Sequence, residues 1–106
     1  MQLVEEIIAR QADIRLLRRD IHAHPELRFE EFRTADLIAA KLTEWGIPVL
    51  RGLGGTGVVG IVKAGDSERA IGLRADIDAL PMTEHNKFEH ASKHAGKMHA
   101  CGHDGH

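Results

Sequence analysis

The last nine residues, 98–106, hold the densest group of potential metal ligands in the sequence. They carry three imidazoles, one thiol and one carboxylate, from His99, Cys101, His103, Asp104 and His106. In an extended chain alternate side chains share one side, which brings the thiol between two of the imidazoles. If a helix begins near the thiol instead, His103 falls in its first turn. Thiolate and imidazole are ligands that suit Zn, Mn, Co and Ni. The spacing therefore predicts a metal site.

Two other interpretations of this segment stay open. The imidazoles can be surface residues beside an inert thiol, or Cys101 and a histidine can form a nucleophile–base pair for acyl transfer. Such a pair gives no reason for the further histidines, so the metal site is favoured. The pattern assigns no individual role to His85, His90, His94 and His99.

Two carboxylates follow the most apolar run, within the stretch 72–81. Asp76 and Asp78 stand two residues apart, so in an extended chain they lie on the same side. Ligands of α/β sheets gather beyond the C-terminal ends of strands. Carboxylates placed there can orient a ligating histidine through its second ring nitrogen. A solvated acidic turn is the alternative interpretation.

Two further motifs favour structural interpretations. Residues 52–57 match G-x-G-x-x-G, but a strand-like run follows where a dinucleotide site needs a helix, so a turn between two strands is favoured. His22 and His24 stand at i and i+2 of a predicted helix and point apart, so they cannot share one ion.

Two helices are predicted to position these groups. Residues 3–24 place apolar side chains on one face, although Arg10 and Gln11 interrupt the stripe, and Pro25 ends the helix. Residues 30–45 form the second helix, with the acids at 30 and 31 in its first turn, where the helix dipole favours them. Gly46 follows its end.

Three apolar runs predict strands, at Ile47–Leu50, Val58–Val62 and Ala70–Leu73. Residues 64–68 have turn composition and predict a hairpin between the last two. Runs this apolar favour strands that are covered on both faces. Helices available to cover a sheet indicate an α/β or α+β architecture, and residues 82–100 form a long loop.

The composition limits the functions to consider. Lys and Arg number 14 against 16 Asp and Glu, a formal charge of −2, which excludes a strongly basic nucleic-acid binder. No apolar run is long enough to span a membrane, and the acidic start lacks the features of a signal peptide. A lone cysteine cannot form an internal disulfide. Together these features predict a cytoplasmic protein that binds neither membranes nor nucleic acid.

Three motifs in this order and spacing resemble a known family: His24–Leu27, Gly72–Pro81 and His99–His106. They are similar to the N-terminal third of the bacterial hippurate hydrolase / N-acyl-amino-acid amidohydrolase family. Plant auxin-conjugate hydrolases belong to the same group, which is related to dinuclear metallopeptidases. The resemblance covers residues 14–106. Because the chain also ends in its densest run of polar chemistry, we expect residues 1–106 to be the N-terminal portion of a longer protein.

The resemblance implies an α/β catalytic domain with helices packed on a mixed sheet, and a satellite domain that mediates homo-oligomer formation. It implies hydrolysis of N-acyl amino acids by water activated at two divalent ions (Mn, Zn, Ni or Co). Cys101 and His103 match the family's first two metal ligands, and the supporting positions are Asp76, Asp78, Asp104 and His106. The general-base Glu and the remaining ligands are expected after residue 106. A stand-alone metal-binding module without catalysis is the alternative.

Overall fold

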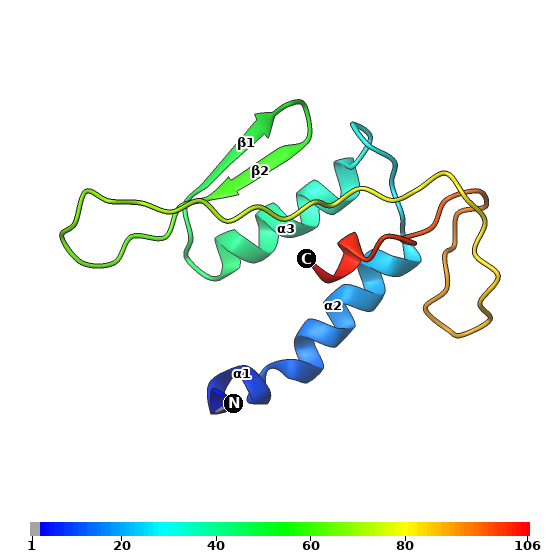
Figure 1. Cartoon of the computed structure of the whole chain (residues 1–106), viewed down its shortest axis with the longest axis horizontal. Helices are drawn as coiled ribbons and strands as arrows, with labels where there is room; N and C mark the ends of the chain where they lie inside the picture. Colours follow the sequence, from blue (N-terminus) through cyan, green and yellow to red (C-terminus); the bar gives the residue numbers. More distant parts are fainter. Residues whose placement is uncertain (1–2) are drawn as a thin grey trace.

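The computed structural model describes residues 3–106, and its chain order is three helices, a two-stranded hairpin and a short terminal helix (Figure 1). The helices are α1 (Glu5–Ala9), α2 (Gln11–Ala23) and α3 (Phe32–Glu44). The strands are β1 (Val49–Leu53) and β2 (Gly57–Gly60), and a 3₁₀ turn, η1, spans His103–Gly105. Within residues 3–106 no helix is both long and apolar enough to cross a bilayer.

The first predicted helix is divided in two, which corrects the expectation of one helix over 3–24. The break falls at Arg10, whose N–H donates to the Ile7 carbonyl as in a tight turn. The next turn then starts from the Arg10 carbonyl, which accepts from the N–H of Ile14. The polar interruption of the apolar stripe marks this point. The C-terminal end is as predicted, because α2 stops at Ala23 before Pro25.

The second predicted helix is confirmed as α3. Its C-terminus closes as expected at Gly46, whose φ of 74° is in the left-handed region. The N–H of Gly46 donates to the Thr43 carbonyl and that of Ile47 to the Leu42 carbonyl, the paired bonds of a Schellman motif. The N-terminus differs from the expectation. Glu31 occupies the N-cap position, and no acid lies in the first helical turn.

The first two predicted strands form with shifted bounds, and they pair with each other in antiparallel fashion. Val49 stands opposite Gly60, and Arg51 opposite Val58, with an irregularity before Leu53 that follows from the positive φ of Gly52. The glycine-rich motif is therefore a turn between strands. The hairpin packs on α3. The expectation of strands covered on both faces is wrong, because every residue of β1 after its first is exposed.

The third predicted strand, Ala70–Leu73, and the hairpin at residues 64–68 are not formed. Residues 61–78 run across the molecule without a strand partner among the described residues (Figure 1). The side chains of Ile71 and Leu73 are 89% and 93% exposed. A strand needs a neighbour to satisfy its backbone groups, and residues 3–106 supply none here. The sheet of residues 3–106 is therefore a single antiparallel pair, while the mixed sheet was expected of the whole catalytic domain.

The loop predicted over 82–100 has no regular secondary structure, but it is closed at its base. Leu80 and Met98 exchange both backbone hydrogen bonds, at 2.9 and 3.0 Å. The N–H of Ala79 donates to the Glu26 carbonyl, and the N–H of Lys93 donates to the Ala23 carbonyl at the end of α2. The loop is thus fixed to the C-terminal end of α2, where the polar residues of the chain gather.

Candidate metal centre

Three potential ligands converge from two distant segments of the chain. Asp76 directly follows residues 61–75, which have no strand partner among the described residues and are called the open segment below. His103 lies on η1, and His106 lies directly after it. One carboxylate oxygen and one ring nitrogen from each histidine all lie within 4.8 Å of one another. Two imidazoles and a carboxylate form a donor set that suits a divalent transition metal. The residues present therefore fit such an ion.

Asp78 holds the ring of His103 in place. The Nδ1 of His103 lies 2.8 Å from Asp78 Oδ1 and 3.1 Å from the Asp78 carbonyl oxygen. With Nδ1–H donating to this carboxylate, Nε2 keeps its lone pair, which is the arrangement of a metal-binding histidine. The spacing of the two acids predicted this type of contact.

Asp76 is kept ionised by its neighbour Arg74. The guanidinium donates two hydrogen bonds to Asp76 Oδ1, at 3.0 and 2.7 Å. These bonds and the charge of Arg74 hold the pKa of Asp76 below its usual value. An ionised carboxylate beside two imidazoles is ready to accept a cation without releasing a proton.

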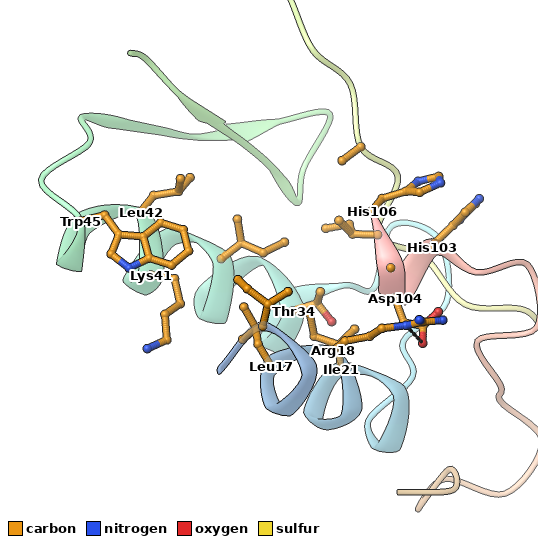
Figure 2. A pocket seen from close by; sticks show the side chains of 15 residues that line it. Leu17, Arg18, Ile21, Thr34, Lys41, Leu42, Trp45, His103, Asp104 and His106 are labelled. Carbon is orange, nitrogen blue, oxygen red and sulfur yellow. Dashed lines mark hydrogen bonds and ion pairs between the residues drawn. The ribbon is translucent and has the colours of Figure 1, made fainter. Parts of the chain in front are cut away.

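Cys101 and Asp104 are not brought into this group. Cys101 is exposed and lies outside the three-residue group. Asp104 is buried and points to the opposite side of η1, toward Arg18 (Figure 2). Among the described residues no hydrogen bond joins Cys101 to an imidazole, so the geometry gives no support to the thiol–histidine alternative.

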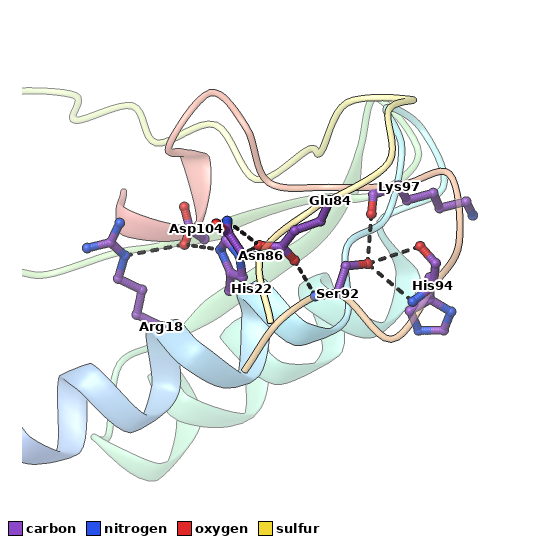
Figure 3. Close-up of polar contacts among 8 residues, drawn as sticks. All are labelled: Arg18, His22, Glu84, Asn86, Ser92, His94, Lys97 and Asp104. Atoms are coloured by element: carbon purple, nitrogen blue, oxygen red, sulfur yellow. Dashed lines mark hydrogen bonds and ion pairs between the residues drawn. The ribbon is translucent and has the colours of Figure 1, made fainter. Parts of the chain in front are cut away.

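The carboxylate of Asp104 enters a network that the sequence did not reveal (Figure 3). Its Oδ2 lies 2.9 Å from His22 Nδ1 and 3.3 Å from Arg18 Nε. The other ring nitrogen of His22 lies 2.8 Å from Glu84 Oε1. Burial alone would lower the pKa of His22, but the hydrogen bonds to Glu84 and Asp104 outweigh it and raise the pKa.

The remaining histidines have different environments. His90 stacks on Phe88 with ring centroids 4.0 Å apart, and His94 meets His24 edge-on at 5.9 Å. His85 is exposed. His99 is buried, and both of its ring nitrogens lack a hydrogen-bond partner among the described residues. Burial lowers the pKa of His99, which keeps this imidazole neutral.

Glu26 positions α3 from outside the helix. Its carboxylate accepts hydrogen bonds from the N–H of Arg33 at 2.9 Å, and from the N–H and hydroxyl of Thr34, each at 2.6 Å. These two N–H groups belong to the first turn of α3, which has no other side-chain cap. The motif His24–Leu27 thus joins the end of α2 to the start of α3.

An apolar cavity of about 290 Å³ lies between α2 and α3 and reaches η1 (Figure 2). Ile14, Leu17 and Ile21 line it from α2, while Ile38 and Leu42 line it from α3. The apolar stripe predicted for the first helix therefore faces a space that residues 3–106 do not fill.

Comparison with known proteins agrees with the motifs. Residues 72–106 match the model of Peptidase family M20/M25/M40. The chain is 50% identical over 106 residues to the hippurate hydrolase of Campylobacter jejuni, covering 100% of this chain and 28% of the relative. It is 44% identical over 105 residues to an N-acyl-L-amino acid amidohydrolase of Geobacillus stearothermophilus, covering 99% of this chain and 28% of the relative.

A solved structure gives the same result for the fold. A dinuclear metal binding peptidase of the M20 family from Bacillus subtilis is 41% identical, with a TM-score of 0.87, over 93% of this chain and 28% of that chain. The fold class and the family resemblance predicted from the sequence are confirmed. The chain spans little more than a quarter of the length of these proteins.

Proposed function

We propose that the whole protein is a member of Peptidase family M20/M25/M40 that hydrolyses the amide bond of N-acyl amino acids, because residues 72–106 match that family's model and the chain is 50% identical to a hippurate hydrolase. Hippurate-like substrates would yield a carboxylic acid and a free amino acid. Residues 1–106 form the N-terminal portion of the catalytic domain in this proposal. The observation that carries it is the convergence of Asp76, His103 and His106 in a chain half identical to a hippurate hydrolase.

The proposed cofactor is a pair of divalent ions, chosen from Mn, Zn, Ni and Co. The proposed ligands are Cys101 and His103, with support from Asp76, Asp78, Asp104 and His106. Such ions, when bound, acidify a coordinated water and polarise the amide carbonyl. The contact between Asp78 and His103 supports this assignment, since it fixes the ring and leaves Nε2 available. The short distances among Asp76, His103 and His106, all within 4.8 Å, support a role for Asp76 and His106 beside His103.

The rest of the protein completes the reaction in this proposal. A Glu beyond residue 106 acts as general base and passes the proton to the leaving nitrogen. The 106-residue chain alone is expected to bind metal weakly, because a partial site offers few bonds for the ordering entropy it costs. We further propose a cytoplasmic homo-oligomer that acts on small molecules and binds neither nucleic acid nor membranes.

The proposal is tested with the whole protein, by measuring hippurate hydrolysis before and after removal of metal. We expect a chelator to abolish turnover and added Mn²⁺ or Zn²⁺ to restore it. Cys101→Ala and His103→Ala are each expected to lower metal content and kcat, while His85→Ala, at an exposed loop position, leaves both unchanged. Full activity in the metal-free protein would refute the proposal. Unchanged metal content and turnover in Cys101→Ala would remove the thiol from the ligand set.

A further inference from the structure

Three segments that are distant in the sequence meet at the imidazole of His22 (Figure 3). His22 lies on α2, and its two ring nitrogens contact Asp104 on η1 and Glu84 in the loop, at 2.9 and 2.8 Å. The side chain of His22 is 13% exposed, and those of Asp104 and Glu84 are 3% and 2% exposed. Water therefore has little access to any of the three groups.

The geometry favours a protonated His22. An ionised carboxylate only accepts hydrogen bonds, so beside two ionised carboxylates each ring nitrogen donates one. Burial would raise the pKa of Glu84, but its hydrogen bonds with His22, Ser92 and Asn86 outweigh burial and lower that pKa. An imidazolium between two carboxylates, with Arg18 beside one of them, leaves this buried cluster without net charge.

The contact between His22 and Asp104, called the Asp104 arm, stabilises η1, because this turn has few hydrogen bonds of its own. The turn has three residues, and only two backbone hydrogen bonds close it: Gly105 to Gly102, and His106 to His103. Isolated turns of this kind are not stable in water. Among the helices and strands η1 packs on α2, in addition to the contact of His103 with Asp78, and Asp104 is the residue of η1 that is buried.

The Glu84 arm holds the loop. The carboxylate of Glu84 also accepts the N–H of Ser92, which reaches across the loop. The hydroxyl of Ser92 in turn donates to the Lys97 carbonyl at 2.7 Å. Through this arm His22 fixes the segment that leads into residues 98–106, whereas the other arm fixes the turn that carries the candidate ligands.

We propose that His22 is a positioning residue of the metal centre: its imidazolium fastens η1 to α2 and so sets His103 and His106 opposite Asp76. This proposal rests on the proposed function, because it assumes that these residues bind metal. His22 itself touches neither ion nor substrate. It acts through Asp104, which immediately follows His103 in the chain.

Removal of His22 leaves Asp104 poorly compensated. Its other side-chain partner is Arg18, at 3.3 Å, with a side chain that is 59% exposed. A buried carboxylate without its main partner is destabilised and moves toward water. Because Asp104 sits in the middle of η1, that movement displaces the residues on either side of it.

The two arms can be separated with two conservative variants. The amide nitrogen of Asn falls near the place of Nδ1, and that of Gln falls near the place of Nε2. His22→Asn therefore keeps a donor toward Asp104, and His22→Gln keeps one toward Glu84 only. Metal affinity is measured by titrating Zn²⁺ and Mn²⁺ separately into the metal-free whole protein, and folding is checked by thermal unfolding of the same samples.

We expect His22→Gln to lose about 10- to 100-fold in metal affinity, the range seen when the outer partners of metal ligands are removed. His22→Asn should lose at least several-fold less. His90→Gln is the matched control, because His90 lies beside His22 but stacks on Phe88. It should bind metal within about twofold of the wild type.

Three results would overturn the proposal. One is wild-type affinity in folded His22→Gln, and another is an equal loss in the Asn and Gln variants, which would assign His22 to the fold alone. If His22→Gln does not fold, Asp104→Asn is measured in its place, because Asn keeps the shape and one acceptor oxygen of Asp but removes the charge. The third result is a wild-type metal affinity in Asp104→Asn. A wild-type protein that binds no metal would instead refute the proposed function.

Discussion

Two regions of this chain are held in opposite ways: a closed region around the C-terminal end of α2, and the open segment, residues 61–75. Around the end of α2, polar side chains such as Thr34, Glu31 and Asp104 are buried and hydrogen-bonded within the chain. Along residues 61–75 the reverse holds, because the apolar side chains of Ile71 and Leu73 lie in water. The candidate metal centre lies where these two regions meet, at Asp76 and η1.

The difference shows what positions the candidate ligands. Apart from Pro25, the buried apolar residues of the described chain are four alanines, Ala23, Ala35, Ala39 and Ala79, which offer little hydrophobic stabilisation. Charged pairs and caps, from Glu26, His22 and Asp78, give the site its local order. If the proposed whole protein has the length of its relatives, of which this chain spans 28%, we expect its remaining residues to pack on the uncovered apolar side chains.

The largest effect is expected from a charge on the open segment. In the whole protein we expect Leu73 to lie in a completed sheet, so Leu73→Asp would bury an unpaired charge. That change costs more than about 4 kcal/mol of unfolding free energy. Chemical denaturation of the whole protein measures it, with Lys63→Asp in the same segment as control. Equal stability of Leu73→Asp and wild type would mean that this segment stays open.

The second effect contrasts two glycines, Gly57 in the hairpin and Gly72 in the open segment. A Cβ on Gly57 would stand 2.3 Å from the Leu53 carbonyl oxygen, so Gly57→Ala forces the hairpin apart at a cost of about 2 kcal/mol. A Cβ on Gly72 meets nothing within 4 Å. Gly72→Ala should be close to neutral, as judged by thermal unfolding of both variants. A neutral Gly57→Ala would show that the hairpin adjusts freely.

The same contrast explains what the sequence could predict. The C-terminal ends of α2 and α3 depend on local signals, Pro25 and Gly46, and these two ends formed as predicted. The strand at 70–73 depends on a distant partner, which local patterns do not describe. The spacing of Asp76 and Asp78 pointed to histidine contacts because it is also local. His22 and Asp104 are 82 residues apart, and no local pattern predicts their contact. The one hint in the sequence is Arg18, which lies one turn before His22 on α2 and places a positive charge on the same face.

The third effect tests the cap in the closed region. Glu26→Ala leaves two N–H groups of α3 and the buried hydroxyl of Thr34 without their acceptor, which costs about 1.5 kcal/mol. Glu30→Ala is the matched control. Its carboxylate is exposed, and its ion pair with Lys97 Nζ is long, at 4.0 Å. The change should therefore cost almost no unfolding free energy. Denaturant unfolding of the two variants compares them directly, and equal losses would contradict the cap.

The smallest effect concerns pH and the buried cluster. Hydrogen bonds to Glu84 and Asp104 outweigh burial and raise the folded-state pKa of His22 above 6.5. Its contribution to stability is thus complete below the unfolded pKa and is lost as pH rises through the folded value. We expect the unfolding free energy of the metal-free wild type to exceed that of His22→Gln most at mildly acidic pH.

As pH rises above 6.5, this difference should shrink by at most about 1.4 kcal/mol per pH unit, the limit for one proton. Unfolding of both proteins across this pH range measures it, and NMR titration of the His22 ring gives the pKa independently. The ordinary imidazole value of 6.5 is the reference. If the ring of His22 titrates below 6.5, the effect of burial exceeds that of the two carboxylates. The closed region would then hold a neutral imidazole that donates to only one of them, and the contrast with the open segment would rest on fewer charged contacts.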